Sequence, residues 1–348
     1  MNNLFVMHTQ YNLILSVGEV SRLKSDNNIL VLFAEFTLSD EMLDSLKKVF
    51  SEMYVVSDKF IGDKKLFDEA TFIRRCLKKV KQLKKTSFDR IYLSQERVFD
   101  TILYEIVKRK NRNVECIAVE EDAYYSINNK FNDANYVHKP SLKAKIKSLL
   151  MAILLIGYRY NYKKFGYCYG MSPIYDSVLV LYPDLVRREL SGKKKYEVLP
   201  QMLNEGIKAI YSNKNISYPE SEKYVLIFFD LMNRYKNKSA VLEVFCGLLE
   251  QCERDNITVL MKYHPRETEK FTLTENVFEI DQIIPAEKVL LDLLGRDVTV
   301  WGNATTSCVV ASKLGYNVNS VVRIDNPENI TIHEKFELMN IYCVKKEN

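Results

Sequence analysis

The stretch ITVLMKYHPRE, residues 257–267, is an apolar run that ends in a histidine and a proline. Its first seven residues are typical of a buried strand. Pro265 suits the first turn of a helix, where its missing N–H costs nothing. His264 is therefore expected at the C-terminal tip of a strand and at the start of a helix, where open α/β sheets bind ligands. A structural histidine at a strand end is the alternative.

Predicted strands and helices alternate on both sides of this stretch. Strands are expected at residues 3–8, 28–35, 52–58, 90–95, 115–122, 177–183, 224–230, 257–265, 276–281, 297–302 and 320–324. Helices are expected at residues 39–52, with Ser39 as a cap, and at residues 68–85, 239–255, 285–295 and 307–315. Such alternation predicts βα units and mostly parallel sheets, so the expected fold class is α/β.

The chain length and one polar segment predict two domains. A chain of 348 residues is long enough for two cores of ordinary size. Residues 191–222 are polar and rich in turn formers, so the boundary is placed there, between residues 1–205 and residues 206–348. The expected architecture is two Rossmann-like domains that face a cleft.

The composition is that of a globular protein, with 47% apolar and 27% charged residues. The net charge of +5 is modest, and no arginine-rich stripe with interleaved aromatics predicts a nucleic-acid partner. The seven cysteines are dispersed and lack CxxC spacing, which argues against a disulfide framework or a zinc site and favours reduced thiols in the cytoplasm. Residues 1–17 lack the basic flank and cleavage site of a signal peptide, so they are expected to form a first strand.

Basic residues concentrate around an apolar core in residues 139–164. Lys143, Lys145 and Lys147 precede the core, and Arg159 follows it. The core is about half as long as the ~20 residues that a bilayer crossing needs. Two interpretations stay open. The segment is a helix buried in the domain with solvated basic ends, or it is an interfacial helix that makes a peripheral membrane contact through anionic headgroups.

Two carboxylate positions follow predicted strands. Glu120, Glu121 and Asp122 end the strand that begins at residue 115, and a carboxylate there can serve as a general base toward a hydroxyl. Asp230 ends the apolar strand of residues 224–230. The alternatives are a solvated acidic turn for the first position and a helix cap or turn for Asp230.

Two further positions suit an anionic ligand. A histidine at a helix N-terminus favours a phosphate nearby and can protonate a leaving oxygen, which fits His264. Asn303, Thr305, Thr306 and Ser307 open a predicted helix directly after a strand, where free N–H groups and hydroxyls form a cradle for phosphate or carboxylate. Ordinary helix capping is the alternative. The sequence has no DxD pair at a strand end for a metal–diphosphate site and no GxxxxGK[ST] or GxGxxG motif.

These motifs resemble those of the bacterial sialyltransferases. The opening NLFVMHTQYNL, RIYLSQERV, the acidic VEED, KYHPRE, IIPAEKVLLDLL and TTSCVV occur in the family's order and span most of the chain. The chain resembles the lipooligosaccharide sialyltransferases of glycosyltransferase family 52 and is more distantly similar to capsule polysialyltransferases. The resemblance implies a GT-B architecture, an acceptor-side first domain and a nucleotide-sugar-binding second domain.

The resemblance also implies catalytic roles. His264 is expected to be the general acid, or a hydrogen-bond donor to the phosphate, as CMP departs. Two residues are candidates for the base. The acidic turn of related families points to Asp122, whereas the lipooligosaccharide enzymes point to Asp230. Ala123 stands where the family usually has glycine, which counts against Asp122.

The remaining expected site residues bind the two substrates. Thr306, Ser307 and Thr305 are expected to hold the phosphate or the sugar carboxylate, and Glu287 the cytidine ribose. The donor side is completed by Pro265, Arg266 and Asn303. Thr9, Gln10 and Glu121 are assigned to the acceptor side.

The resulting hypothesis is an inverting sialyltransferase that moves sialic acid from CMP-sialic acid to a terminal sugar of a bacterial lipooligosaccharide or capsule. No metal and no cofactor besides the donor substrate are expected. The expected location is the cytoplasm, and a place at the inner face of the plasma membrane is left open. The alternatives are another donor (CMP-Kdo, another CMP-nonulosonate or a UDP-sugar) or a non-catalytic assembly protein of the same pathway. A homodimer is left open.

Overall fold

The computed structural model of the chain describes residues 1–23, 27–33, 36–57, 66–128, 142–156, 170–211, 216–270 and 277–345. The chain divides into two units. Unit 1 comprises residues 1–126 and 130–210, and unit 2 comprises residues 127–129 and 211–348. Each unit is an α/β domain with a parallel sheet, which confirms the predicted fold class.

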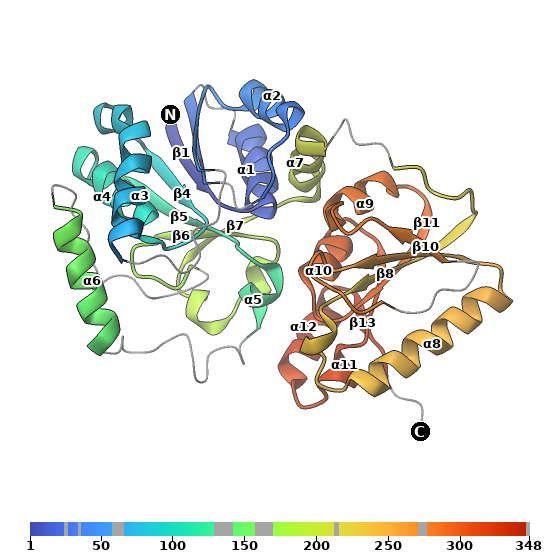
Figure 1. Cartoon of the computed structure of the whole chain (residues 1–348). Coiled ribbons are helices and arrows are strands. Elements are labelled where there is room, and N and C mark those ends of the chain that lie inside the picture. The colour runs from blue at the N-terminus through green and yellow to red at the C-terminus, as the bar shows by residue number, and fades with distance from the viewer. Residues whose placement is uncertain are drawn as a thin grey trace. The chain divides into compact units, whose positions relative to one another are not determined.

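Unit 1 contains a seven-stranded parallel sheet (Figure 1). Its strands are β1 (Asn2–Met7), β2 (Asn27–Phe33), β3 (Glu52–Ser57), β4 (Arg90–Leu93), β5 (Glu115–Val119), β6 (Ser177–Val180) and β7 (Lys194–Glu197). Their spatial order is β3-β2-β1-β4-β5-β6-β7, so the chain direction across the sheet reverses between β1 and β4. This reversal is the switch point of a Rossmann-like sheet, and ligands bind beyond the carboxyl ends of the strands there.

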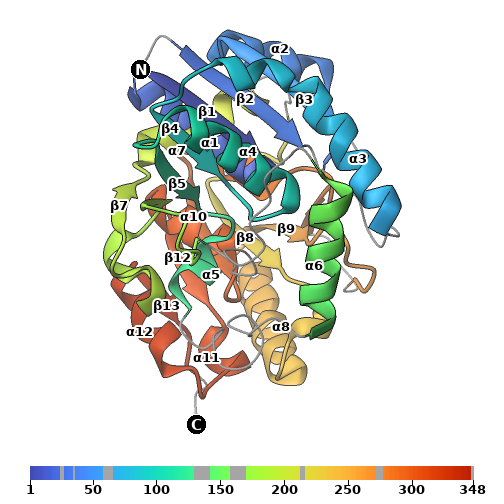
Figure 2. The same cartoon turned by 90° about the vertical axis from the view of Figure 1, so that its left-hand side faces the viewer.

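Helices cover both faces of this sheet (Figure 2). They are α1 (Gln10–Leu23), α2 (Asp40–Val49), α3 (Leu66–Lys79), α4 (Val98–Lys110), α5 (Ala123–Ile127), α6 (Leu142–Leu154) and α7 (Pro200–Tyr211), with 3-10 turns at Lys81–Lys85, Pro183–Leu185 and Arg188–Leu190. Strand β1 is buried on both sides from Asn3 to Met7. A strand covered on both faces needs apolar side chains throughout, which explains why the central strands were predictable from continuous apolar runs.

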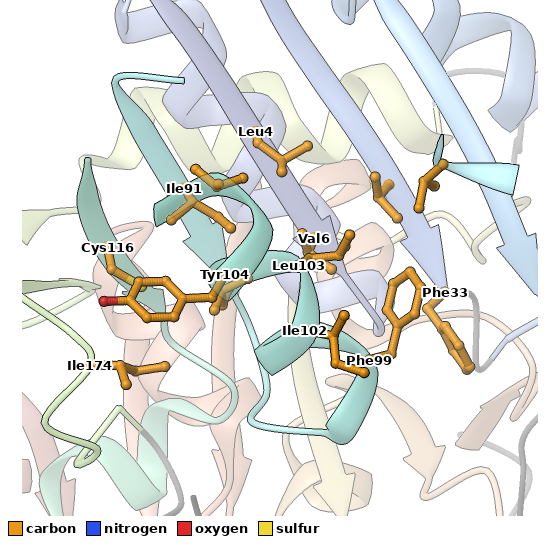
Figure 3. Packing of buried hydrophobic residues seen from close by; sticks show 14 of the residues in the cluster. Leu4, Val6, Phe33, Ile91, Phe99, Ile102, Leu103, Tyr104, Cys116 and Ile174 are labelled. Atoms are coloured by element: carbon orange, nitrogen blue, oxygen red, sulfur yellow. The ribbon is translucent and has the colours of Figure 1, made fainter. Parts of the chain in front are cut away.

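Successive side chains of β1 enter two different cores, because a strand alternates its faces. Leu4 and Val6 belong to the core that α3, α4 and α6 cover, and Figure 3 shows them with Phe33 and Phe99. The ring centroids of Phe33 and Phe99 are 5.7 Å apart. On the opposite face, Phe5 stacks on the ring of Tyr92, with centroids 4.3 Å apart.

Unit 2 contains a six-stranded parallel sheet of the same kind. Its strands are β8 (Lys223–Phe229), β9 (Thr258–Tyr263), β10 (Val277–Ile280), β11 (Asp297–Gly302), β12 (Asn317–Ser320) and β13 (Ile341–Cys343). Its helices are α8 (Lys238–Arg254), α9 (Ala286–Asp292), α10 (Thr306–Lys313), α11 (Val322–Asp325) and α12 (Ile330–Leu338), with a 3-10 turn at Met232–Arg234. The spatial order β10-β9-β8-β11-β12-β13 places the switch point between β8 and β11.

Several local predictions were wrong. Residues 1–17 are not one strand, because β1 ends at Met7 and α1 begins at Gln10. The strand expected at residues 320–324 is mostly helix α11, whose apolar residues Val322 and Ile324 are buried in the core. The polar segment 191–222 is not only turns, because it contains β7 and α7.

Helices α1 and α7 pack with their backbones in close approach. A Cβ atom on Gly206 of α7 would clash with the carbonyl oxygen of Ile14, and one on Gly18 of α1 would clash with that of Met202. Neither clash is with a flexible side chain, so only a shift of one helix relieves it. Glycine at both positions therefore sets how closely α7 approaches α1 in unit 1.

The substitution Gly206→Ala is expected to destabilise unit 1 by roughly 1–3 kcal/mol or more, because it overpacks a backbone contact. The matched control is Gly247→Ala on α8, where a Cβ atom meets nothing within 4 Å. That change is expected to stabilise by about 0.5–1 kcal/mol, because alanine is the better helix former. Urea denaturation of the two variants measures both effects. Equal stability of the Gly206→Ala variant and the unaltered protein would show that α7 does not need this close approach.

Candidate functional site

Three of the predicted site residues lie at the carboxyl edge of the sheet in unit 2. Phe229 at the end of β8 pairs with Tyr263 at the end of β9, so Asp230 and His264 follow paired residues on adjacent strands. On the other side of β8, Gly302 of β11 pairs with Phe228, and Asn303 follows directly. Asp230, His264 and Asn303 therefore lie along one edge, at and beside the switch point.

The ring of His264 is held by its own loop. The backbone N–H of Arg266 donates to Nδ1 of His264 at 3.1 Å, so in the neutral ring the proton is on Nε2. Burial lowers the pKa of His264 below its ordinary value, and the negative charge of Asp230 opposes this lowering. The positive charges of Arg266 and Arg234 lower the pKa further. At neutral pH the side chain is thus mainly an uncharged hydrogen-bond donor at Nε2.

The expected helix after His264 is absent from the described residues. Residues 264–267 form a turn in which the N–H of Glu267 donates to the carbonyl of His264 at 2.9 Å. Proline is favoured at the second position of such a turn, which explains Pro265 without a helix. No helix therefore starts at His264 in the described residues, and an anion beside it must be held by the imidazole, by nearby cations and by other groups along this edge.

The carboxylate of Glu267 explains why the chain turns here. It accepts hydrogen bonds from the N–H groups of Thr268 and Glu269, both at 2.7 Å, and from the N–H of Met232 in the loop after β8. Although burial by itself raises its pKa, these backbone donors hold the pKa of Glu267 below its ordinary value. Glu267 thus joins the loops that carry Asp230 and His264.

Asp230 is fixed at the end of β8 by local contacts. Its Oδ1 accepts from the N–H of Leu231 at 2.8 Å and lies 3.5 Å from Nη1 of Arg234. Its own N–H donates to the hydroxyl of Tyr235 at 3.2 Å. The turn role considered for this residue is therefore real, and the side chain remains 20% exposed beside His264.

The start of α10 lies beyond the end of β11. Thr305 is the N-cap of α10, and its hydroxyl accepts from the N–H of Cys308, so this hydroxyl is used by the helix itself. Thr306 and Ser307 are the first two residues of the helix, where backbone N–H groups have no helical acceptor. A Cβ atom on Gly302 would lie 2.6 Å from Sγ of Cys308, so glycine lets α10 start close to the strand.

Asn303 is held in a buried chain of hydrogen bonds. Its Nδ2 donates to Oδ2 of Asp325 at 2.8 Å, and Oδ1 of Asp325 accepts from the N–H of Asn237 at 3.0 Å. Asn303 is 7% exposed, and its own Oδ1 accepts no hydrogen bond from any residue that the structure describes.

Glu287 and Lys262 form a second charged group near the same edge. Glu287 is in the first turn of α9, where burial raises its pKa and Lys262 opposes the rise. Burial lowers the pKa of Lys262 to about 8, and its Nζ donates to the carbonyls of Gln282 at 2.9 Å and Tyr263 at 3.1 Å. Pro265 and Arg266, by contrast, are exposed.

In unit 1 the acidic turn after β5 has one buried member. Glu120 is 5% exposed, and its Oε2 accepts from the hydroxyl of Tyr11 at 2.8 Å and from the N–H of Leu181 at 3.3 Å. Burial raises the pKa of Glu120 to about 7, although these bonds and one from Ser126 lower it. The backbone carbonyl of Glu120 accepts from Asn12 at 2.8 Å. Glu120 thereby ties the turn to α1 and to the loop after β6.

The other two acidic residues of this turn are partly exposed. Gln95, which follows β4, donates to Oε1 of Glu121 at 3.1 Å. The backbone carbonyl of Asp122 accepts from the N–H of Ser126 at 3.1 Å, because α5 begins at the next residue. That residue is Ala123, which is completely buried, so the departure from glycine coincides with a packed helix start.

The remaining acceptor-side residues lie at the start of α1. Thr9 caps this helix: its carbonyl accepts from the N–H of Leu13 and its hydroxyl from the N–H of Asn12. Gln10 is the first residue of the helix and is partly exposed. Both positions follow β1 at the switch point of unit 1, beside the end of β4.

Two residues of unit 1 were missed as candidates. Completely buried His8 directly follows β1. Its Nε2 lies 2.8 Å from Oδ1 of Asp100, which also caps α4 through the N–H of Arg97. Glu120 was noticed but not selected. A signal existed for His8, because VMH ends an apolar strand as MKYH does.

Comparisons with known proteins support the architecture. No protein-family model and no curated protein matches the sequence. Among solved structures, the UDP-GlcNAc 2-epimerase from Methanocaldococcus jannaschii is 12% identical, with a TM-score of 0.54, over 100% of this chain and 94% of that one. The UDP-GlcNAc 2-epimerase from Neisseria meningitidis bound to UDP-GlcNAc is 12% identical, with a TM-score of 0.55, over 100% and 88%. The glycotransferase of kitacinnamycin is 10% identical, with a TM-score of 0.53, over 99% and 86%.

At these identities the similarity concerns the fold. The chain has the GT-B fold. The edge of unit 2 offers a neutral imidazole donor, a carboxylate beside it and a helix start. These groups suit a ligand that carries both an anion and hydroxyl or amino donors. Within the described ranges, no three His, Cys, Asp or Glu side chains are arranged to hold a metal ion.

Proposed function

We propose that the chain is a glycosyltransferase that moves sialic acid from CMP-sialic acid to a terminal sugar of a bacterial surface glycan, with inversion and without a metal. One observation carries the proposal: Asp230, His264 and the start of α10 occupy one edge of a single sheet at its switch point. The choice of sialic acid and CMP is supported by the motif resemblance, which is strongest at KYHPRE.

The departing phosphate is placed between His264 and α10. In this arrangement Nε2–H of His264 donates to a non-bridging or leaving oxygen, and the backbone N–H groups of Thr306 and Ser307 donate to the other oxygens of the phosphate. A neutral imidazole is a poor proton donor but a good hydrogen-bond donor. The lowered pKa of His264 therefore favours hydrogen-bond stabilisation of CMP over full protonation of it at neutral pH.

The nucleoside is assigned to the group around α9. Glu287 accepts from the ribose hydroxyls, and Lys262 limits how far the pKa of that carboxylate rises. Pro265 and Arg266 are exposed on the same loop as His264 and are proposed to contact the donor from the edge of its binding site.

The general base is assigned to Asp122. Inversion requires the acceptor hydroxyl to attack from the face opposite to the departing phosphate. Asp230 lies beside His264 on the same edge, and it is already engaged by Arg234 and the N–H of Leu231. Asp230 therefore suits the role of positioning and tuning His264. The base role then falls to the other candidate that the motif resemblance offers, which is Asp122 of the acidic turn after β5. Gln10, Thr9 and Glu121 are proposed to lie along the acceptor.

A UDP-sugar enzyme is the second candidate. It is supported by similarity over the whole chain to two UDP-GlcNAc 2-epimerases, one of them bound to UDP-GlcNAc. The same edge could hold a uridine nucleotide, because a phosphate and a ribose are common to both donors. Motif resemblance favours CMP, and fold similarity alone does not choose between the two.

The test is a donor panel. The purified chain is incubated with CMP-sialic acid, CMP-Kdo or UDP-GlcNAc, with and without a galactoside acceptor, and nucleotides are quantified by ion-pair chromatography. The expected result is CMP release from CMP-sialic acid that the acceptor stimulates. The His264→Ala protein, purified identically, controls for contaminating enzymes.

Each other outcome points to a different function. Release of UDP without CMP would show that the donor is a UDP-sugar. Conversion of UDP-GlcNAc to its 2-epimer without an acceptor would show that the enzyme is an epimerase and not a transferase. No turnover of any donor would favour the non-catalytic assembly protein.

A further inference from the structure

Helix α6 exposes a continuous row of large apolar side chains. Ile146, Leu149, Leu150 and Ile153 are 50%, 51%, 44% and 57% exposed, and Ile156 just beyond the helix is 76% exposed. Their spacing of three and four residues places them on one side of the helix. These five residues are called the apolar stripe below. A contiguous exposed patch of this kind marks an interaction surface more often than a single exposed leucine does.

The apolar stripe is not the side by which α6 packs on its own domain. Met151 and Leu155 are 2% and 0% exposed, and they belong to the core of unit 1 with residues of α3. Helix α6 lies beside α3 at the edge of unit 1 (Figure 1). One side of α6 is thus buried in the domain, as the first interpretation of this segment expected, and the side with the apolar stripe is exposed.

The charged residues of the segment that contains the apolar stripe have one sign. Residues 139–164 carry seven basic residues and no acidic one: Lys139, Lys143, Lys145, Lys147, Arg159, Lys163 and Lys164. Three of these positions, residues 143, 145 and 147, lie in the first half of α6 itself. A helix with an exposed apolar row, whose charged residues are all lysines, matches the chemistry of an anionic lipid surface, which offers hydrocarbon below a layer of negative headgroups.

We propose that α6 docks unit 1 on an anionic membrane surface, with the apolar stripe inserted at the boundary between headgroups and acyl chains. The inference goes beyond the proposed reaction and does not depend on it. The helix lies along the surface, because its 13 residues span only about 20 Å against a hydrocarbon core of about 30 Å. No helix in the described part of the chain is long and apolar enough to cross a bilayer.

A second copy of the chain fits the same surface less well. A two-fold interface places the same patch on both partners, so two helices that each carry three lysines and no acidic residue would meet. Like charges facing each other oppose association, whereas anionic headgroups neutralise them. Charge complementarity therefore selects the membrane.

The experiment is co-sedimentation of the full chain with vesicles of phosphatidylcholine alone or with phosphatidylglycerol. Two variants remove one contribution each: Leu149→Gln/Ile153→Gln changes the stripe, and Lys143→Gln/Lys145→Gln/Lys147→Gln changes the charge. The variant Ile330→Gln/Leu338→Gln on α12 controls for the loss of two exposed apolar side chains, because these residues are 63% and 69% exposed. Lys81→Gln/Lys84→Gln/Lys85→Gln controls for the loss of three charges from the same unit.

The unaltered chain and both controls are expected to bind the phosphatidylglycerol vesicles. Each α6 variant is expected to bind them at least about tenfold more weakly. Thermal melting should be unchanged, because the altered side chains of the stripe are exposed. Equal sedimentation of the stripe variant and the unaltered chain would overturn the proposal, as would no binding by the unaltered chain. So would a stripe variant that turns a dimer into a monomer in analytical ultracentrifugation while vesicle binding stays the same.

Discussion

Replacing His264 by alanine is expected to lower turnover at least about a hundredfold while CMP still binds, because a positioned donor is worth roughly two to four powers of ten in rate. Nucleotide affinity should fall less, since the helix start at Thr306 and the group around Glu287 remain. Initial rates and calorimetric titration with CMP measure the two effects separately. Lys270→Ala, an exposed change just beyond the same turn, is the control and should leave both values within about twofold of the unaltered protein.

Two further substitutions distinguish what the imidazole does. His264→Asn keeps an acceptor for the N–H of Arg266, whereas His264→Gln offers an amide donor nearer to the position of Nε2. If hydrogen-bond donation is the main contribution, the glutamine variant should retain about tenfold more turnover than the asparagine variant. Equal loss in the two variants would argue for proton transfer instead. Full activity of the His264→Ala variant would show that His264 has no role in catalysis.

The second large effect is expected from Asp122→Asn, which should lower turnover at least about a hundredfold if Asp122 is the base. Raising the pH should not restore the rate, because the amide cannot accept the proton. Asp184→Asn, an exposed aspartate in the loop after β6, is the matched control in unit 1. Normal turnover of the Asp122 variant would return the base role to Asp230.

Asp230→Asn is expected to have a smaller effect of a different kind. The negative charge of Asp230 raises the pKa of His264 against the lowering by burial, so its removal leaves that pKa lower still. The limb of the pH–rate profile that reports His264 should therefore move to lower pH in this variant, whichever protonation state is active. The Asp122→Asn variant should leave this limb in place. A limb that does not move would show that Asp230 does not tune His264.

Much of the fold could be predicted because its central strands are buried on both sides. β1, β8 and β9 consist almost wholly of buried apolar residues, so their runs stand out in the sequence. The cap of α2 was also predictable, since Ser39 accepts from the N–H of Met42 as a capping serine should.

The outer elements gave weaker signals. β7 is KKYE and β12 is NVNS, and neither has the apolar run that marks a central strand. They become strands because a neighbouring strand offers parallel hydrogen bonds, which is a tertiary cause. α11 was mistaken for a strand because a short apolar run has no period that separates a buried helix from a strand.

The candidate site was partly predictable for a related reason. Carboxyl ends of parallel strands meet at one edge, so Asp230, His264 and Asn303 could be expected together once the strands were known. The turn after His264 could not be predicted, because it depends on the carboxylate of Glu267. That carboxylate accepts from the N–H of Met232, which is 35 residues away in the sequence. The burial of Glu120 likewise depends on α1 and on the loop after β6, which are distant in sequence.

The most direct test of the account is an NMR titration of the four histidines, labelled with ¹⁵N in the rings, with and without CMP. His264 is identified by its loss in the His264→Gln variant, and buried His333 serves as an internal reference. The account predicts that saturating CMP shifts the His264 ring signals and raises the pKa of His264, because a phosphate beside Nε2 favours the charged ring, while His333 stays the same. Saturating CMP that leaves the signals and the pKa of His264 unchanged would contradict it.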